Sequence, residues 1–360
     1  MSYIIKNEKI YKDKDDLPTV SLLVAVHNEE LIIEKKINNA LSINYPKEKL
    51  EIIFASDNST DKTNEIINEF SKKNENIKLI EIGERGGKVN AYNKAYKIAK
   101  GEILAFSDAN TFWETNALSN LIQPLKRKDV ACTCGHIIYT NEEESEIAFS
   151  ESLYWKLENK IKEGESKIYS LTALNGGIYA IKREHYIEID PLYSHDLCFP
   201  LLFAAQNKRT IFVKDALAFE RSGTTKEDEV RRKRRMFGRI YSFVLKNPSY
   251  FFNPLKYPFR YFALVFSHRT LRYSLPFLHL ILFLSNIFLF TRGNIYKDFF
   301  FLQIISVVFT VFYTSLKRKP KSMNIIPYYF LFLHSMLLGF FDFITGRIKP
   351  YWDLAKTTRR

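Results

Sequence analysis

The segment VSLLVAVHNEE, residues 20–30, decides the fold of the N-terminal half of the chain. Its first seven residues, Val20–Val26, are almost entirely apolar or β-branched, and a short apolar run of this kind is typical of a buried strand. The polar residues 27–30 end the run, and apolar residues at helical spacing follow between residues 31 and 41. A buried strand that leads directly into a helix is the opening unit of an α/β fold.

The same alternation continues along the next seventy residues. Apolar runs predict further strands at residues 50–55, 77–82 and 102–106. Helical patterns lie between them, at residues 63–70 and 90–99. Because strands alternate with helices, we expect an α/β fold with a doubly wound, mostly parallel sheet.

Polar clusters follow three of the predicted strands, and each contains a carboxylate: Glu29, Asp57 and Asp108. In an open α/β sheet ligands bind beyond the carboxyl ends of the strands, so we expect these three side chains to share one crevice. Carboxylates gathered in this way cost free energy unless they are paired, hydrogen-bonded or bound to a metal. Each alone fits a helix cap or a turn, whereas the three together indicate a binding site.

The overall composition is that of a folded chain. With 360 residues, 46% of them hydrophobic and 26% charged, the chain is long enough for about two domains and too apolar to be disordered as a whole. The three cysteines, Cys132, Cys134 and Cys198, are an odd number, which argues against a disulfide framework and favours a reducing compartment. A Cys-x-Cys pair alone does not make a zinc site, which requires four ligands.

The formal net charge of +13 raises the question of nucleic acid as a partner. The densest basic cluster, residues 231–235, lies shortly before the apolar C-terminal part, where it can meet anionic lipid headgroups. The sequence has no zinc-finger, RNP or helix-turn-helix signature. We therefore expect membrane lipids, and no nucleic acid, as partners.

Three runs in the C-terminal part contain no charged residue, at 275–291, 299–316 and 323–341. Each is close to the ~17 to 25 residues that a helix needs to cross about 30 Å of hydrocarbon. A buried helical core is the alternative, but the short basic segments between the runs favour a membrane. The expected organisation is a soluble domain at 1–240, an interfacial amphipathic linker at 241–272 and membrane helices at 273–360.

The sequence leaves two alternatives for how the chain crosses the membrane and on which side its C-terminal tail lies. The first apolar run of the chain is too short for a signal peptide, so we expect a multi-pass protein of the plasma (inner) membrane with its N-terminal domain in the cytoplasm. Three spans would then put the tail outside, yet five basic residues between 347 and 360 favour the inside. Either the run at 323–341 is re-entrant, or the region 257–266 also enters the membrane.

Four segments, in this order and spacing, resemble a known family: VSLLVAVHNEE at 20–30, EIIFASDNSTDKT at 51–63, GGK at 86–88 and GEILAFSDAN at 101–110. They resemble the membrane-bound family 2 glycosyltransferases with a GT-A fold, which are related to cellulose, hyaluronan and poly-N-acetylglucosamine synthases. With later motifs the resemblance extends to about residue 240. It implies a GT-A domain that uses a nucleotide diphospho-sugar, with a UDP-sugar as the expected donor.

The resemblance implies roles for residues at the first strand ends. Val26, His27 and Glu29 would lie at the base and ribose of the nucleotide. Asp57 would face the base. Lys88 would reach the diphosphate, because a lysine is a compact point charge suited to phosphate oxygens.

The resemblance also implies a metal. Asp108 would be the metal-binding carboxylate of the family's Asp-x-Asp element. A divalent cation, Mg or Mn, would bridge the two phosphates and neutralise the leaving nucleotide. The second acidic position is occupied by Asn110, whose amide oxygen is still able to ligate the cation.

Two later motifs match the acceptor side of the family. The turn at Gly176 and Gly177 would let a sugar approach the backbone, since neither residue has a Cβ. In YSHD, which ends at Asp196, this aspartate would be the general base that takes a proton from the acceptor hydroxyl as it attacks the anomeric carbon with inversion. His195 stands where the family usually has an acid, and we expect it at the acceptor.

The segment EVRRKRR, which starts at Glu229, falls where polymerising members of the family carry Gln-x-x-Arg-Trp. Arg232 would clamp the leaving diphosphate, with Arg231 or Arg235 as helical neighbours able to do the same. Glu229 replaces the glutamine and Lys233 the tryptophan, which removes the stacking platform expected for a growing glycan. Transfer is therefore better supported than polymerisation.

These observations lead to one expected function and one alternative. We expect an inverting glycosyltransferase that moves a hexose or N-acetylhexosamine to a carbohydrate or lipid-linked acceptor at the membrane. Polysaccharide synthesis, with export through partner proteins, is an extension of this expectation. The alternative is a non-catalytic membrane subunit that binds a nucleotide sugar as a regulator of polysaccharide synthesis. A nucleotidyltransferase is disfavoured, since it would require a glycine-rich signature near the N-terminus.

Overall fold

The N-terminal part of the chain folds into the alternating strands and helices that its sequence predicts. The computed structural model describes residues 16–316, 320–351 and 358. Its first elements are β1 (Val20–Val26), α1 (Ile33–Leu41), β2 (Leu50–Asp57), α2 (Thr63–Ser71), β3 (Ile77–Ile82), α3 (Gly87–Ile98) and β4 (Ile103–Asp108). All seven residues of β1 are buried, because helices cover both faces of the sheet at this strand.

Eight strands form one sheet in the order β3-β2-β1-β4-β7-β6-β8-β5. The strands of its second half are β5 (Phe112–Trp113), β6 (Val130–Tyr139), β7 (Tyr179–Lys182) and β8 (Arg209–Glu220). The first four strands in the order are parallel to one another, and β6 and β8 are again parallel. Only β7 and β5 run antiparallel to their neighbours. The expected α/β class with a mostly parallel sheet is confirmed.

Asparagines give the chain its sharp turns at the ends of β1 and β2. Asn28 has a φ of 53° and Asn58 a φ of 57°, left-handed conformations that asparagine adopts more readily than most residues. The side-chain oxygen of Asn28 accepts a hydrogen bond from the backbone N–H of Thr60 at 2.7 Å, and its backbone N–H donates to Ser59 Oγ at 3.1 Å. The two strand-end loops are therefore tied together.

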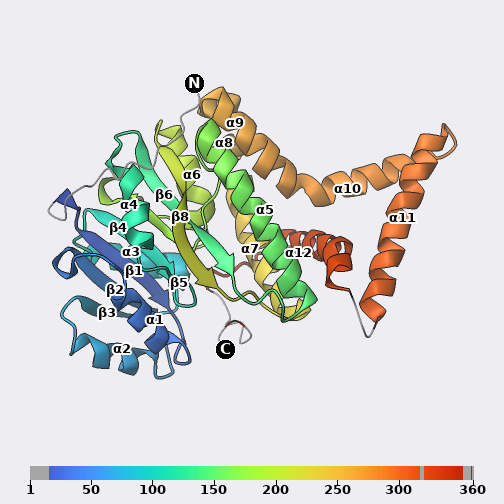
Figure 1. Cartoon of the computed structure of the whole chain (residues 1–360). Helices are drawn as coiled ribbons and strands as arrows, with labels where there is room; N and C mark the ends of the chain where they lie inside the picture. Colours follow the sequence, from blue (N-terminus) through green and yellow to red (C-terminus); the bar gives the residue numbers. More distant parts are fainter. Residues whose placement is uncertain (1–15, 317–319, 352–357, 359–360) are drawn as a thin grey trace.

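Two long helices, α5 (Glu146–Ile168) and α7 (Lys226–Lys246), lie between the sheet and the C-terminal helices (Figure 1). The helix α6 (His195–Ala205) is mostly buried and packs against β8, while the short α4 (Ala117–Ile122) packs on the other face of the sheet. α7 begins with a threonine cap, since Thr225 Oγ1 accepts from the backbone N–H of Asp228 at 3.3 Å.

Among the described residues of the C-terminal part, three helices are long and apolar enough to cross a membrane, one for each predicted run, although the first begins at Phe259, within the segment expected as an interfacial linker. The first is a continuous helix, Phe259–Phe288, made of α9 (Phe259–Val265), a π-helical turn (Phe266–Thr270) and α10 (Leu271–Phe288); the short α8 (Ser249–Phe252) precedes it. The others are α11 (Asn294–Ser315) and α12 (Ile325–Ile344). In Figure 1, α10 and α11 project away from the sheet, whereas α12 packs against α7. Of the five basic tail residues, Lys356, Arg359 and Arg360 lie outside the described residues.

Candidate active site

A cavity of about 580 Å³ opens beyond the carboxyl ends of the parallel strands, where ligands bind in sheets of this type. Its volume is in the range of small-molecule binding sites. The predicted site residues that line it are Glu29, Lys88, Asp108, Asn110, Gly176, Gly177, His195, Asp196 and Arg232, together with the alternative cations Arg231 and Arg235.

Three predicted residues, Val26, His27 and Asp57, lie behind the cavity wall rather than on it. Both carboxylate oxygens of Asp57 accept backbone N–H groups, from Gly86 and Gly87, each at 2.8 Å. These amides form the N-terminus of α3, so Asp57 caps this helix, and the carboxylate does not face the cavity. His27 Nδ1 hydrogen-bonds the carbonyl oxygen of Asp57 at 2.7 Å. The shared crevice expected for three carboxylates therefore contains Glu29 and Asp108 but not Asp57.

Lys88 extends from the capped start of α3 into the cavity. Its Nζ forms an ion pair with Asp108 and donates a hydrogen bond to the carbonyl oxygen of Gly176 at 2.9 Å. Both charged side chains remain partly open, with 24% and 29% of their surface exposed. The lysine is therefore free to exchange the carboxylate for another anion that enters the cavity.

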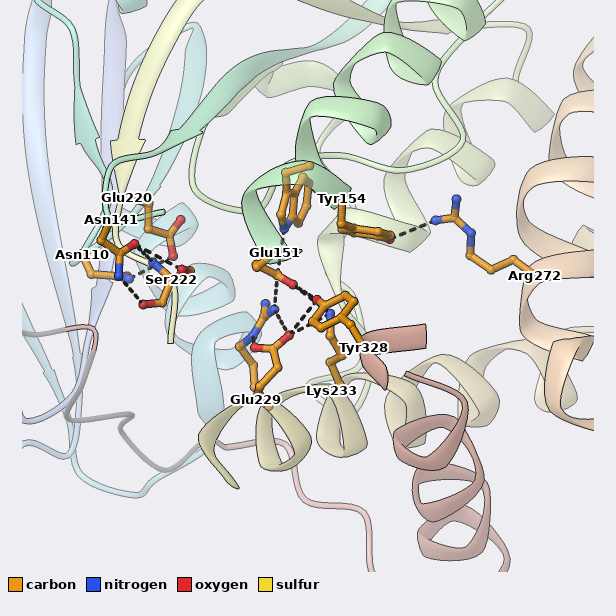
Figure 2. Close-up of polar contacts among 12 residues, drawn as sticks. Asn110, Asn141, Glu151, Tyr154, Glu220, Ser222, Glu229, Lys233, Arg272 and Tyr328 are labelled. Carbon is orange, nitrogen blue, oxygen red and sulfur yellow. Dashed lines mark hydrogen bonds and ion pairs between the residues drawn. The ribbon is translucent and has the colours of Figure 1, made fainter. Parts of the chain in front are cut away.

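Glu220, at the end of β8, lies beside the Asp108–Asn110 turn. Its Oε1 accepts from Asn110 Nδ2 at 3.0 Å (Figure 2). Its Oε2 accepts from Thr111 Oγ1 at 3.3 Å. We did not predict this residue from the sequence. The available signal was that Glu220 ends a strand, as Asp108 does. We call Lys88, Asp108, Asn110 and Glu220 the donor cluster.

A second residue missed from the sequence is Lys36, from α1. It is buried beneath the same turn, where its Nζ donates to Ser107 Oγ at 2.7 Å and to the carbonyl oxygen of Thr111 at 2.5 Å. Burial lowers the pKa of Lys36 to about 7, against the charges of Asp108 and Glu220, which raise it. Lys36 thus holds the backbone of the turn and faces both carboxylates.

The oxygen donors of this turn fit a hard divalent cation. Among the described residues, no three His, Cys, Asp or Glu side chains come close enough to hold a metal by themselves. Two carboxylates, from Asp108 and Glu220, and the amide oxygen of Asn110 leave most of the coordination shell to other ligands. Mg²⁺ is commonly bound in this way, by one or two carboxylates plus substrate phosphates.

Asp196, at the start of α6, faces the cavity across the Gly176 turn. A Cβ on Gly176 would lie 2.8 Å from Asp196 Oδ2, so only glycine leaves the carboxyl in its place. Burial raises the pKa of Asp196, and the charge of Asp108 adds to this, while Lys88 and Arg239 act in the opposite direction. A raised pKa suits a carboxylate that has to accept a proton.

His195 touches the cavity wall but belongs mainly to the core. Its Nδ1 is 2.8 Å from the hydroxyl of Tyr179, and its ring stacks on Tyr92 with 5.5 Å between centroids. Burial holds the pKa of His195 well below its ordinary value, with Lys88 adding to the effect. The imidazole is therefore neutral and packs among aromatic side chains of the core, Phe199 included.

Arg232 lies at the far end of the cavity in a cluster of buried charges. It donates to Glu229 through Nε at 3.1 Å and Nη2 at 2.9 Å, and it also pairs with Glu151 of α5. Lys233 Nζ lies 2.9 Å from Glu229 and 3.2 Å from Glu151. The hydroxyl of Tyr328, on α12, donates to both glutamates (Figure 2). We call these five residues the helix cluster.

The helix cluster explains two departures from the family motif. Glu229 and Lys233 stand where the motif has glutamine and tryptophan, and they pair with each other. Glu151 and Arg232 add one further charge of each sign, so the four side chains balance. Glu151, Glu229 and Lys233 have only 1–2% of their side-chain surface exposed. Burial alone would raise the pKa of Glu151, but Lys233 and Arg232 hold it below its ordinary value. Arg232 is thus engaged in holding helices together, and Arg231, Arg234 and Arg235 are the other members of the basic segment on the cavity wall.

Comparisons with known proteins agree with this fold. The family model "Glycosyl transferase family 2" matches residues 21–189, so this part of the chain is similar to the family 2 glycosyltransferases. The chain is 36% identical over 121 residues to the probable glycosyltransferase YdaM of Bacillus subtilis, and 35% identical over 116 residues to a beta-monoglucosyldiacylglycerol synthase of Nostoc sp.. Each match covers 32% of this chain and only 28% and 25% of the relative.

One solved structure resembles nearly the whole chain. It is the mannosyltransferase PcManGT from Pyrobaculum calidifontis, in complex with GDP-Man and Mn²⁺. The TM-score is 0.65 and the identity 20%, with 95% of this chain and 92% of that chain covered. At this identity the likeness shows a shared GT-A fold, including the C-terminal helices.

Proposed function

We propose that this protein is a family 2 glycosyltransferase, an inverting enzyme that moves a hexose or N-acetylhexosamine from a nucleotide diphospho-sugar to an acceptor at the membrane. The observation that carries the proposal is the position of two sets of groups on one cavity. The donor cluster lies on one side of the Gly176 turn, and the carboxyl of Asp196 lies against the other. The cavity thus has a place for an anionic leaving group and a base for an incoming hydroxyl.

In this reaction Lys88 binds the diphosphate, and Asp196 orients the acceptor hydroxyl and takes its proton. The bond between the acceptor oxygen and the anomeric carbon forms as the bond from that carbon to the phosphate oxygen breaks, so the nucleotide diphosphate leaves with the electron pair. A divalent cation, Mg or Mn, held by Asp108, Asn110 and Glu220, would neutralise the charge on the leaving diphosphate. Asp57, His27 and Val26 support the donor site from behind.

The donor is proposed to be a UDP- or GDP-sugar and the acceptor a carbohydrate or a lipid-linked sugar. The catalytic domain would lie on the cytoplasmic side of the plasma (inner) membrane, where nucleotide sugars are found. Position 233 carries a buried lysine in the helix cluster, so it offers no aromatic platform to a glycan chain. Addition of one or a few sugars is therefore favoured over long-chain synthesis with export partners.

The test is a transfer assay on the detergent-solubilised full chain. Radiolabelled UDP- and GDP-sugars are supplied with and without Mg or Mn, beside the Asp196→Asn variant and with membrane lipid extract as acceptor source. Labelled product from the wild type alone, dependent on the cation, supports the proposal. Nucleotide-sugar binding without turnover in either protein would instead identify a regulatory subunit, and the chain length of the product separates single addition from polymerisation.

A further inference from the structure

The helix α12 is held by the catalytic domain at its N-terminal end. Just before the helix, Asn324 Nδ2 donates to the carbonyl oxygen of Glu146 at 3.1 Å and to Ser150 Oγ at 3.0 Å, both at the start of α5. One turn later, the hydroxyl of Tyr328 donates to Glu229 Oε1 at 3.3 Å. These contacts place the beginning of α12 on the surface of the soluble domain.

The middle of α12 lies in close backbone contact with α7. A Cβ on Gly339 would lie 2.7 Å from the backbone nitrogen of Gly238 and 2.7 Å from the carbonyl oxygen of Arg234, so the two helices approach as only glycine allows. Phe332 packs against Phe237 with 5.0 Å between ring centroids.

The C-terminal end of α12 is also held by the catalytic domain. Arg234 of α7 forms a bidentate pair with Asp342, with two hydrogen bonds of 2.6 Å. Beyond the helix, the chain passes over the loop that precedes Lys88. The ring of Tyr351 stacks on Arg85 at 4.6 Å, and the Pro350 carbonyl occupies the space where Gly87 lacks a Cβ. The segment after α12 therefore reaches the donor side of the cavity.

These contacts are incompatible with a membrane crossing by α12. Tyr328 and Asp342 are 14 residues apart, about 21 Å along a helix, and both contact α7. Hydrocarbon around this stretch would also surround α7, which carries five consecutive cations at residues 231–235. Lysine and arginine are strongly disfavoured at the centre of a bilayer, so this placement is excluded.

The helix α11 is covered far less, and Tyr313 is its single buried residue. None of its most apolar 18-residue window is buried, against 44% of the corresponding window of α12. Exposed side chains such as Ile305, Val308 and Phe312 lie along its length. The hydrocarbon core of a bilayer is the partner that fits a helix that is apolar on all sides.

We propose that α10 and α11 form the membrane-crossing hairpin, and that α12 does not cross but lies along α7 at the membrane surface. Residues 345–351 then face the same compartment as the catalytic cavity. This topology resolves the conflict between three apolar runs and a basic tail, because two crossings return the chain to the catalytic side. The outer face of α12, with Ile325, Phe341 and Ile344 exposed, would rest against the headgroup region.

The test is labelling of single cysteines in the full chain with a membrane-impermeant maleimide, in sealed membrane vesicles of both orientations. The unsubstituted protein is the blank, because its three native cysteines are buried. Thr345→Cys probes the segment after α12, Arg292→Cys the turn between α10 and α11, and Glu65→Cys the exposed surface of α2; all three positions are exposed.

We expect Thr345→Cys and Glu65→Cys to be labelled in the same vesicles, and Arg292→Cys only in vesicles of the opposite orientation or after permeabilisation. Labelling of Thr345→Cys together with Arg292→Cys would overturn the proposal, since α12 would then be a span. Labelling of all three from one side would overturn it too, because the hairpin would not cross. Lys349→Cys, also exposed, replaces Thr345→Cys should that variant fail to accumulate. The readout is independent of transferase activity.

Discussion

The donor cluster and the helix cluster border the same cavity and contain similar groups, yet their charges are used differently. In the donor cluster, Lys88 and Asp108 keep about a quarter of their side-chain surface open to solvent. In the helix cluster, Glu151, Glu229 and Lys233 are 1–2% exposed, and each faces an opposite charge. Charge content alone therefore does not identify a site. The groups available to a ligand are those whose partners leave them accessible.

The largest expected effect comes from removing the base. Asp196→Asn keeps the size of the side chain but cannot accept a proton at neutral pH, so we expect turnover to fall about 10²- to 10⁴-fold. Binding of the nucleotide sugar and the thermal midpoint should stay close to wild type. Asp190→Asn, an exposed neighbour outside the cavity, is the matched control. Wild-type turnover in Asp196→Asn would remove the general-base assignment.

The pH profile tests the same residue. Because burial raises the pKa of Asp196, the base is already partly protonated at a pH where an ordinary aspartate is ionised. Activity should therefore be lost, as pH falls, at a higher pH than an unperturbed aspartate would give. Initial rates measured at saturating donor and metal check this. A flat profile down to the ordinary aspartate range would contradict it.

A comparable free-energy effect, but on stability, is expected in the helix cluster. Lys233→Met leaves Glu151 and Glu229 short of one cation in a buried site, and breaking such a pair costs about 3 to 5 kcal/mol. Thermal unfolding in detergent should show a large drop, while the folded fraction still binds nucleotide sugar. Lys246→Met, exposed at the end of the same helix, is the control. A variant with normal stability and lost donor binding would move Lys233 from a structural to a binding role.

A smaller effect, on the affinity for the metal ion, is expected at Glu220 of the donor cluster. Replacing this carboxylate by glutamine keeps hydrogen bonds to the turn but removes a negative charge next to Asp108. Loss of even an outer-shell partner weakens metal binding about 10- to 100-fold. Titration of Mn²⁺ by electron paramagnetic resonance, with nucleotide diphosphate present, measures this without turnover. Asp215→Asn, on the same strand, is the control. Unchanged Mn²⁺ affinity in Glu220→Gln would mean that Glu220 does not bind the metal and only accepts hydrogen bonds from Asn110 and Thr111.

The sequence predicts the local elements well because their signals are local. The strand Val20–Val26 is found with the predicted bounds. A run of seven apolar residues has the usual length of a buried strand and is too short for a typical buried helix. The side-chain direction of Asp57 is different: its partners, the amides of Gly86 and Gly87, are about thirty residues away in the chain. A residue type at a strand end therefore predicts a polar edge but not which way the carboxylate points.

The sequence did not identify Glu220, and it left the run that forms α12 with two alternatives, for the same reason. Glu220 acts beside Asn110 only because β8 brings it there, 110 residues later in the chain. The apolar composition of α12 resembles that of α11, and what separates them is contact with α7, roughly a hundred residues earlier. Hydropathy indicates that the side chains of a helix avoid water. Whether they are surrounded by lipid or by other parts of the protein is shown only by the packing of the folded chain.

The smallest expected effect is at the pair Arg234–Asp342, which holds the end of α12. Its hydrogen bonds are short, but 42% of the arginine side chain is exposed, and exposed pairs contribute about 0.2 to 1 kcal/mol. Arg234→Gln should therefore lower the thermal midpoint only slightly, far less than Lys233→Met one residue away. The exchange Arg234→Asp with Asp342→Arg should restore most of the loss. A loss of stability as large as that of Lys233→Met would mean that the end of α12 is held as tightly as its beginning. The contrast between solvent-exposed and buried charges would then not apply to this helix.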